Sequence, residues 1–525
     1  MRIRAGRESK AVIPGLFALI VWLLVPPILF FVLRPHVAAP LTFLSATLFL
    51  PELISFDLPV LPEIGKEELA SLAAIVCCIA FAPGALRRAG PGRGPEALML
   101  VLFFGTSISI FNNLDSIRVG PVLVPGVEAT SILAAVLSDL MSWGFPFLIG
   151  RALITRSEEL RDLLAILVIA GLVYSLLILF EVRMAPRLNR MVYGFHQHSF
   201  AQALRDGGAY RPMVFMRHGL HVALFTVMYM SAGWILMRTR YRLPLIPFVP
   251  KLAVAGYLSL ILVLCRSTGA LLYGLTIAPL VALAPTRLQI WAAVGIAVLA
   301  LSYPAIRVAK ILPIAELTTL AEEQFGEKRA HSFAGRMRTE EQLTTKIQER
   351  PIFGWGSSGR AMVRDEVTGQ NLTTYDGVWL ILFVRTGLVG FLCVFGLLLA
   401  PVFLAALHFG RIRATQDRAM VAGLALMVSI RVFDLLPNST TEGYLTLLSG
   451  ALAGAVPGIL REQARGDAAR REDAAGPGGA GGIAGRDSAS GAKAGRFAGG
   501  ESGPTLGKDL LGPPGLRGPR RRGKR

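Results

Sequence analysis

The chain has 525 residues, of which 53% are hydrophobic and only 17% are charged, and its mean hydropathy is +0.54. A soluble protein carries about a quarter charged residues, so this composition excludes a soluble enzyme, a disordered chain and a fibrous protein. The net charge of +19 would suggest a nucleic-acid partner for a soluble protein. In a membrane protein, however, Lys and Arg gather in cytoplasmic loops and tails. We therefore expect membrane lipids, and no nucleic acid, among the partners.

Apolar runs close to the roughly 20 residues needed to cross a bilayer recur from residue 12 to residue 460. The runs are continuous rather than alternating, so they predict helices and not the strands of a membrane barrel. The expected fold class is all-α, with residues 1–460 forming a polytopic transmembrane helix bundle. The Pro26-Pro27 pair predicts a kink in the first span. The candidate spans are residues 12–33, 37–52, 67–84, 96–112, 129–150, 162–181, 213–235, 247–265, 268–284, 288–308, 378–408, 418–436 and 441–460.

Arginine-rich connections orient these spans, because positive loops stay on the cytoplasmic side. With these connections inside, the loops 182–212 and 309–377 lie on the outer face. The tail, residues 461–525, also lies inside, and its Gly, Ala, Pro and Arg composition predicts a disordered basic segment near anionic lipid. The four connections that agree in alternation contain Arg87, Arg88 and Arg93; Arg151, Arg156 and Arg161; Arg238, Arg240 and Arg242; and Arg411, Arg413 and Arg418.

The expected number of spans depends on the N-terminus, where the span count and the charge predict opposite orientations. Thirteen spans with an inner tail would place the N-terminus outside, whereas Arg2, Arg4, Arg7 and Lys10 favour the inside. We therefore expect about 12 spans, with one of the first two runs not crossing separately. No group of Cys, His or acidic residues has metal-ligand spacing, so we expect neither a metal nor another cofactor.

Two basic elements begin spans on the expected outer face. Arg266 separates two apolar runs, where a positive charge is costly and marks a functional position unless it only snorkels to the interface. The segment from Tyr210 onwards places Arg211, Arg217 and His221 at the start of another span, and the last two share one helix face. Guanidinium groups bind phosphate oxygens in a planar, bidentate manner. We expect these residues to bind either ordinary lipid headgroups or a pyrophosphate.

The long outer loop, residues 309–377, is the second candidate region, because a loop of this length is usually functional or disordered. It contains His331, Arg336 and Arg338. Residues 332–347 predict a helix that ends at Pro351, with Arg336 and Glu340 on one face. A solvated surface helix with ordinary salt bridges is one reading, and an anion site is the other.

The sequence also contains carboxylates that we expect to lie beside cationic side chains. Asp376 precedes an apolar run, and a carboxylate beside cations stays ionised and can accept a proton from a sugar hydroxyl. Arg385, nine residues later, is a candidate partner for Asp376. Arg431 and Asp434 lie three residues apart within one span, and we expect them to pair with each other.

Several of these residues occur in an order that resembles the O-antigen ligase and Wzy-type O-antigen polymerase superfamily, over roughly residues 200–450. Arg266-Ser267-Thr268-Gly269 is similar to an earlier Ser-Arg-Gly motif of that superfamily. The segments that carry the rest of the resemblance are Ser332-Phe333-Ala334-Gly335-Arg336, Pro351-Ile352-Phe353-Gly354-Trp355-Gly356, Asp376-Gly377-Val378-Trp379-Leu380 and Arg385-Thr386-Gly387-Leu388-Val389-Gly390.

The resemblance implies a GT-C-like membrane glycosyltransferase in the bacterial inner membrane, with its active site facing the periplasm. Its substrate would be a glycan on undecaprenyl diphosphate, and chain-length regulator or flippase proteins would be possible partners. Arg266, Arg217, Arg211, Arg336, Arg338, His221 and Arg385 would bind diphosphate or substrate. Asp376, with His331 as second choice, would activate the acceptor hydroxyl.

The two residues before Val378-Trp379-Leu380 distinguish the two activities of this superfamily. Ligases usually carry a His-Asn pair there, whereas this chain has Asp376-Gly377. This difference favours polymerisation of an O-antigen or exopolysaccharide over ligation to lipid A-core. A glycan or lipid flippase is a further alternative, but the charges concentrate in the outer loops instead of being distributed through many spans. A non-catalytic scaffold would tolerate alanine at Arg266 and Asp376.

Overall fold

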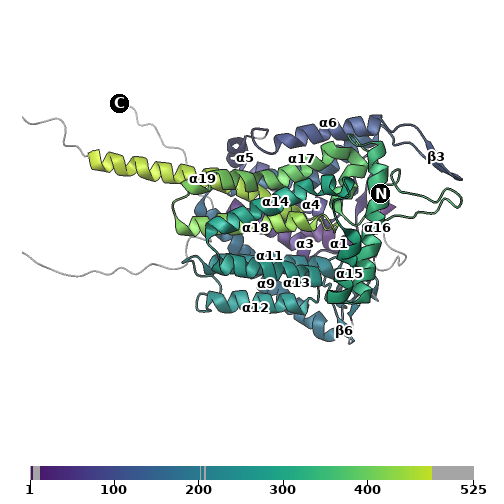
Figure 1. The fold of residues 1–525 in the computed structure, drawn as a ribbon. Helices are drawn as coiled ribbons and strands as arrows, with labels where there is room; N and C mark the ends of the chain where they lie inside the picture. Colours follow the sequence, from purple (N-terminus) through teal and green to yellow (C-terminus); the bar gives the residue numbers. More distant parts are fainter. Residues whose placement is uncertain (1, 4–11, 91, 201–202, 206–207, 476–525) are drawn as a thin grey trace, which may run out of the picture.

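The computed structural model describes residues 2–3, 12–90, 92–200, 203–205 and 208–475. Long helices run side by side to form a bundle, and one further helix, α16, lies across one end of it (Figure 1). The helices before α16 are α1 (Val12–Trp22), α2 (Val25–Val32), α3 (Pro35–Phe49), α4 (Lys66–Phe81), α5 (Pro83–Ala89), α6 (Ala97–Phe111), α7 (Ser131–Asp139), η2 (Leu140–Gly144), α8 (Phe145–Leu153), α9 (Ser157–Met184), α10 (Leu188–Tyr193), α11 (Gly219–Met237), α12 (Lys251–Leu264), α13 (Thr268–Leu283), α14 (Thr286–Val308) and α15 (Ile314–Phe325). They are followed by α16 (Glu327–Glu349), α17 (Val378–His408), η4 (Phe409–Arg411), α18 (Thr415–Asp434) and α19 (Gly443–Ala475).

The all-α membrane architecture agrees with the prediction, but the expected count of about 12 spans is not confirmed. Within the described residues, seven helical segments are long and apolar enough to cross a membrane, or eight if α4 and α5, bent by 102°, form one span. Four other apolar helices, α3, α6, α12 and α13, are shorter. The first span is interrupted at Leu23 and Leu24, directly before the proline pair, as predicted. Because α3 is separate from α1 and α2, the structure gives no reason to merge the first two runs.

Strands occur only as three short two-stranded sheets in the part of the chain that the structure describes. β1 (Arg2–Ile3) pairs with β2 (Phe56–Asp57), β3 (Ile117–Val119) with β4 (Val122–Val124), and β5 (Leu204–Arg205) with β6 (Ala209–Tyr210), all antiparallel. The β1–β2 pairing places Arg2 beside the connection between α3 and α4, at the end of the bundle that α16 covers.

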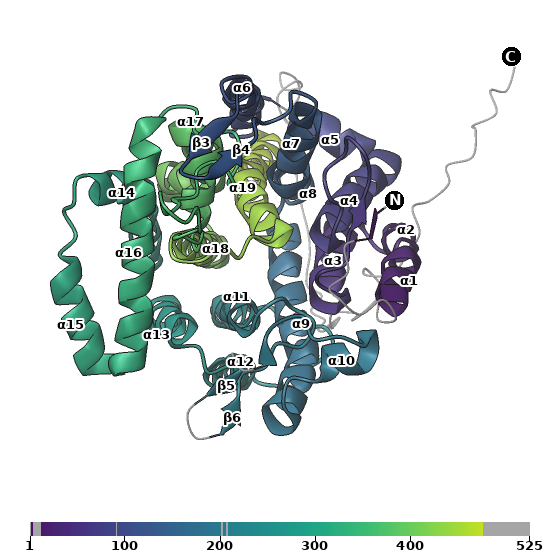
Figure 2. The same cartoon turned by 90° about the vertical axis from the view of Figure 1, so that its right-hand side faces the viewer.

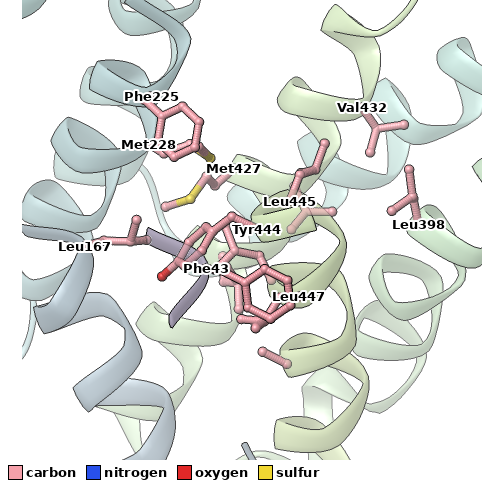
Figure 3. Packing of buried hydrophobic residues seen from close by; sticks show 14 of the residues in the cluster. Phe43, Leu167, Phe225, Met228, Leu398, Met427, Val432, Tyr444, Leu445 and Leu447 are labelled. Carbon is pink, nitrogen blue, oxygen red and sulfur yellow. The ribbon is translucent and has the colours of Figure 1, made fainter. Parts of the chain in front are cut away.

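Helix α19 and its neighbours form the centre of the bundle. Phe43, Phe225, Met427, Tyr444 and Leu447 are completely or almost completely buried there (Figure 3). In contrast, α1 and α2 expose most of their apolar side chains, as expected of helices that face lipid.

The basic tail begins later than predicted. Helix α19 continues through residues 461–475, where Asp467 receives two hydrogen bonds of 2.8 Å from Arg413. The expectation of disorder from residue 461 is therefore wrong for this part. Residues 476–525 lie outside the described residues.

Helix α16 confirms the predicted helix in the long loop, but its charges pair differently from the prediction. Glu340 is buried and accepts a hydrogen bond of 2.8 Å from Nε of Arg307 at the end of α14. Burial raises the pKa of Glu340, although Arg307 opposes that effect. This pair, together with buried Met337, Leu343 and Ile347, fixes α16 across the end of the bundle.

Candidate functional site

A cavity of about 1060 Å³ lies at the end of the bundle that α16 covers. Viewed from this end, α11 and α19 lie near the centre, with α4 on one side and α16 on the other (Figure 2). Four of the nine predicted site residues line the cavity, although they are up to 159 positions apart in the sequence: Arg217, His221, Arg336 and Asp376. The other lining residues are Pro51, Glu52, Leu53, Ile54, Ser55, Glu63, Gly65, Lys66, Glu67, Glu68, Met141, Ser142, His198, His218, Leu220, Pro437, Asn438, Ser439, Thr440, Thr441, Glu442 and Gly443.

Arg336 and Asp376 form one wall of the cavity, which we call the α16 wall. Nε of Arg336 lies 3.8 Å from Oδ2 of Asp376, and both side chains are nearly half exposed. Nη1 of Arg336 also donates to the carbonyl oxygen of Pro437 at 3.3 Å and to Oδ1 of Asn438 at 3.4 Å. Arg336, and not Arg385 as expected, is therefore the partner of Asp376.

The start of α17 brings Asp376 to this wall. A Cβ atom at residue 377 would lie 1.9 Å from the carbonyl oxygen of Leu436, so only glycine allows this close approach. The next amide, that of Val378, donates to the carbonyl oxygen of Leu435 at 2.9 Å. The Asp376-Gly377 pair of the sequence motif thus places the carboxylate beside the connection between α18 and α19.

The opposite wall, which we call the α4 wall, is built around Lys66 and Glu52. Nζ of Lys66 lies 2.7 Å from Oε1 of Glu52 and donates to the carbonyl oxygens of Thr47 and Phe215 at 3.0 and 3.3 Å. The amide of Arg217 donates to the same Glu52 oxygen at 3.2 Å. Burial alone would raise the pKa of Glu52, but Lys66 and the other nearby cations outweigh it and hold this pKa below its ordinary value of 4.5.

His221 joins these walls to the buried centre of the bundle. Its Nε2 atom lies 2.6 Å from Oε1 of Glu442, which directly precedes α19. Glu442 in turn accepts hydrogen bonds of 3.1 and 3.0 Å from Nη2 of Arg431. Burial opposes the ionisation of Glu442, but Arg431 and His221 outweigh that effect and lower its pKa. Nη1 of Arg431 donates to Asp434 at 2.8 Å, which confirms the predicted pair.

The sequence interpretation missed Glu52, Lys66 and Glu442. Each carries a charge at the end of an apolar run, on the face that the arginine-rich connections assign to the outside. That position is a detectable signal for an intramembrane or interfacial site. The partners are 14 and 221 residues away along the chain, so no local spacing reveals the pairs.

Two predicted arginines, Arg211 and Arg266, do not line the cavity. Arg211 is buried, and its Nη2 atom donates to Oγ of Ser267 at 2.9 Å, which ties the segment before α11 to the turn between α12 and α13. Arg266 occupies that turn with a φ of 51° and an exposed side chain. A positive φ is uncommon for residues other than glycine and occurs here at the end of α12.

The remaining predicted residues also lie outside the cavity lining. His331 and Arg338 are exposed on α16. Arg385 is half-buried within α17, where its charge acts on Asp139, and its carbonyl oxygen accepts a hydrogen bond of 2.6 Å from Ser109.

The Pro-Ile-Phe-Gly-Trp-Gly and Arg-Thr-Gly-Leu-Val-Gly motifs form one structural unit. Helix α17 is broken at Gly387, where φ is 65° and ψ is −157°. The amides of Trp355 and Gly356 donate to the carbonyl oxygens of Val384 and Arg385 at 2.7 and 3.0 Å. The turn therefore satisfies backbone groups that the break would leave without partners at membrane depth.

Among the residues that the structure describes, no group of three or more His, Cys, Asp or Glu residues is arranged to hold a metal ion. The cations and carboxylates of the cavity can instead bind an anion and exchange a proton with a neighbouring hydroxyl.

Comparison with known proteins assigns part of the chain to a family. Curated proteins give no match to the chain. The O-antigen ligase family model matches residues 253–395, which include Arg336 and Asp376 but neither Arg217 nor His221. The apolar helices describe a multi-pass membrane protein, and its residues 253–395 are similar to the O-antigen ligase family. Residues 253–395 form a domain of the O-antigen ligase family, consistent with the O-antigen ligase and polymerase superfamily that the sequence motifs indicated.

Proposed function

We propose that the protein is a membrane glycosyltransferase that polymerises oligosaccharide repeats carried on undecaprenyl diphosphate, as O-antigen or exopolysaccharide. The observation that carries the proposal is the cavity, where Arg217 and His221 meet Arg336 and Asp376 of the O-antigen ligase domain. The cavity of about 1060 Å³ is at the upper end of the usual size range of ligand sites, so it can accommodate part of a glycan substrate.

The cations of the cavity would bind the leaving group. In the proposed reaction, an acceptor hydroxyl attacks the anomeric carbon of the donor sugar, and the bond from that carbon to the diphosphate oxygen breaks. Negative charge develops on the diphosphate, and fixed donors aimed at developing charge stabilise such a transition state. Arg217 and Arg336 line the cavity with exposed side chains, so we assign the diphosphate to them.

Asp376 would accept the proton of the attacking hydroxyl. Its carboxylate lies in the cavity beside Arg336, so the base and the diphosphate-binding cation are adjacent. His331, the second choice, is exposed on α16 outside the cavity lining. We therefore prefer Asp376.

The remaining assignments follow from the chemistry of this substrate. The arginine-rich connections would lie in the cytoplasm, so the cavity would open to the periplasmic face of the bacterial inner membrane. The lipid chain of the donor would lie among the helices. Chain-length regulators or flippases would be functional partners, because the substrate must first reach the outer leaflet.

Ligation of a finished glycan to lipid A-core is the second candidate, favoured by the family description of residues 253–395. The Asp376-Gly377 pair in place of His-Asn is our reason for ranking polymerisation first. A deletion strain separates the two on a glycan gel: loss of long chains indicates a polymerase, whereas long chains that never reach lipid A indicate a ligase.

Asp376→Asn tests the catalytic assignment in purified protein. We expect turnover of lipid-linked repeats to fall about 10²–10⁴-fold, the usual contribution of a general base, while donor binding is retained. Glu366→Gln is the matched control, because it removes an exposed carboxylate from the same loop. Normal elongation by Asp376→Asn would refute the assigned base. Absence of both elongation and ligation by the wild type would refute the proposed function.

A further inference from the structure

Arg431 is an unusual residue for the centre of a helix bundle. It lies in α18, its side chain is completely buried, and it binds two carboxylates that are equally buried. Nη1 donates to Oδ2 of Asp434 at 2.8 Å, and Nη2 donates to both oxygens of Glu442 at 3.1 and 3.0 Å. An ionisable group at such a depth is costly, and in membrane proteins it usually serves function.

The two carboxylates lead from Arg431 to different walls of the cavity. Glu442 lies 2.6 Å from Nε2 of His221, which lines the cavity, and the amide of the next residue, Gly443, donates to Oε2 of Glu67 in α4 at 3.3 Å. Oδ1 of Asp434 accepts a hydrogen bond of 2.8 Å from Nδ2 of Asn438. The other side-chain atom of that amide, Oδ1, accepts the 3.4 Å bond from Arg336 on the α16 wall. One guanidinium group thus stands at the centre of a continuous chain of polar contacts from His221 to Arg336.

Stability alone does not explain this chain of polar contacts. A buried ion pair contributes little net stability, and apolar residues of similar volume are often equally stable in its place. A guanidinium group, however, presents its donors in a rigid planar fork, so two bound carboxylates are held at a fixed separation. That separation fixes His221 relative to Asn438, and through Asn438 it fixes Arg336.

We propose that Arg431 is a positioning residue that sets the spacing between the α4 wall and the α16 wall. The inference rests on the proposed function, because the spacing matters for a substrate that contacts both walls at once. Arg431 itself is not among the residues that line the cavity, so it acts through His221 and Arg336.

The test separates positioning from folding by comparing two variants. Arg431→Lys keeps the charge but loses the fork. The triple variant Arg431→Met, Asp434→Asn, Glu442→Gln removes the three charges together, so none of these three is left buried without its partner, and the protein should retain most of its thermal stability. Arg151→Lys is the control, since it alters another arginine–glutamate pair, with Glu96, and neither residue of that pair lines the cavity.

We expect both variants to turn over lipid-linked repeats about a hundredfold more slowly, as for a misplacement of about 1 Å. Binding of undecaprenyl diphosphate should weaken about tenfold, the effect of losing one well-placed charged hydrogen bond. Arg151→Lys should be normal in both measurements. If Arg431→Lys fails to fold, the turnover and binding measured for the triple variant test the inference.

A stable triple variant with normal binding and turnover would show that Arg431 has only a structural role and would overturn the inference. A wild-type protein that binds undecaprenyl diphosphate but forms no glycan product would refute the proposed function alone, and weaker binding by the triple variant would then still support the inference. A wild-type protein that neither binds nor reacts would overturn both.

Discussion

The α4 wall and the α16 wall line the same cavity with different kinds of contact. On the α4 wall, Lys66 is 4% exposed and is bound by Glu52 and by backbone carbonyl oxygens. On the α16 wall, Arg336 and Asp376 are 44% and 45% exposed, and their closest charged atoms are 3.8 Å apart. The α4 wall is therefore arranged before any ligand binds, whereas the side chains of the α16 wall can still move toward one.

The two walls also differ in their relation to the family. The α16 wall lies within residues 253–395, which match the O-antigen ligase family, and the α4 wall lies outside them. Arg336 and Asp376, which lie within the matched residues, thus complete a cavity whose buried side comes from other parts of the chain. This division suggests that the α16 wall carries the reaction and that the α4 wall fixes the position of the substrate.

Lys66→Met gives the largest effect that we expect on stability, and it tests whether the α4 wall is preorganised. Removing the ammonium group leaves Glu52 with a poorly compensated charge, and breaking a buried pair costs about 3–5 kcal/mol. Arg336→Ala, in the exposed pair, should change the free energy of unfolding by less than about 1 kcal/mol. Thermal unfolding in detergent measures both. Equal losses in the two variants would contradict the contrast between the walls.

A smaller loss of thermal stability is expected when the pH is lowered. The pKa of Glu52 is below its ordinary value of 4.5 in the folded protein, so its ionised form stabilises the fold. This contribution is complete above the ordinary pKa and is lost as the pH falls through the lowered value. The unfolding temperature of the wild type should therefore decrease below about pH 4.5. The unfolding temperature of Glu52→Gln should decrease less steeply over the same pH range. A Glu52→Gln curve parallel to that of the wild type would exclude this role of Glu52.

The sequence could predict the helical class and part of the α16 wall, because both depend on local patterns. Apolar runs predict the helices, and the motif that contains Asp376 places its carboxylate next to a glycine that allows close packing. Helix periodicity also predicts one shared helix face for Arg217 and His221, and this is wrong, because α11 begins only at Gly219; Arg217 lines the cavity from the segment before the helix. The pairing of Lys66 with Glu52, or of His221 with Glu442, depends on which helices pack together, and local spacing does not contain that information.

Arg266 shows the opposite case, in which a strong local signal belongs to a residue outside the cavity lining. The sequence places a cation between two apolar runs, which indicates an unusual position but not the direction of its side chain. In the structure, the positive φ of Arg266 belongs to the turn that ends α12, and the side chain is exposed outside the cavity lining. Arg217, with a weaker local signal, lines the cavity because α11 begins there.

Arg266→Ala is therefore expected to have the smallest effect, even though the sequence marks Arg266 as a functional candidate. A surface substitution usually changes the free energy of unfolding by less than about 0.5 kcal/mol. Because Arg266 lies outside the cavity lining, turnover should also stay within about twofold of the wild type, which corresponds to about 0.4 kcal/mol of activation free energy. Arg217→Ala is its matched comparison and should lower turnover by about 10²–10³-fold, the loss seen when one donor to a developing anion is removed. Turnover of lipid-linked repeats by the two variants, at equal amounts of inserted protein, measures the difference. If Arg266→Ala were as inactive as Arg217→Ala, the anion would be bound at the turn between α12 and α13 as well, and the two walls would not suffice to describe the site.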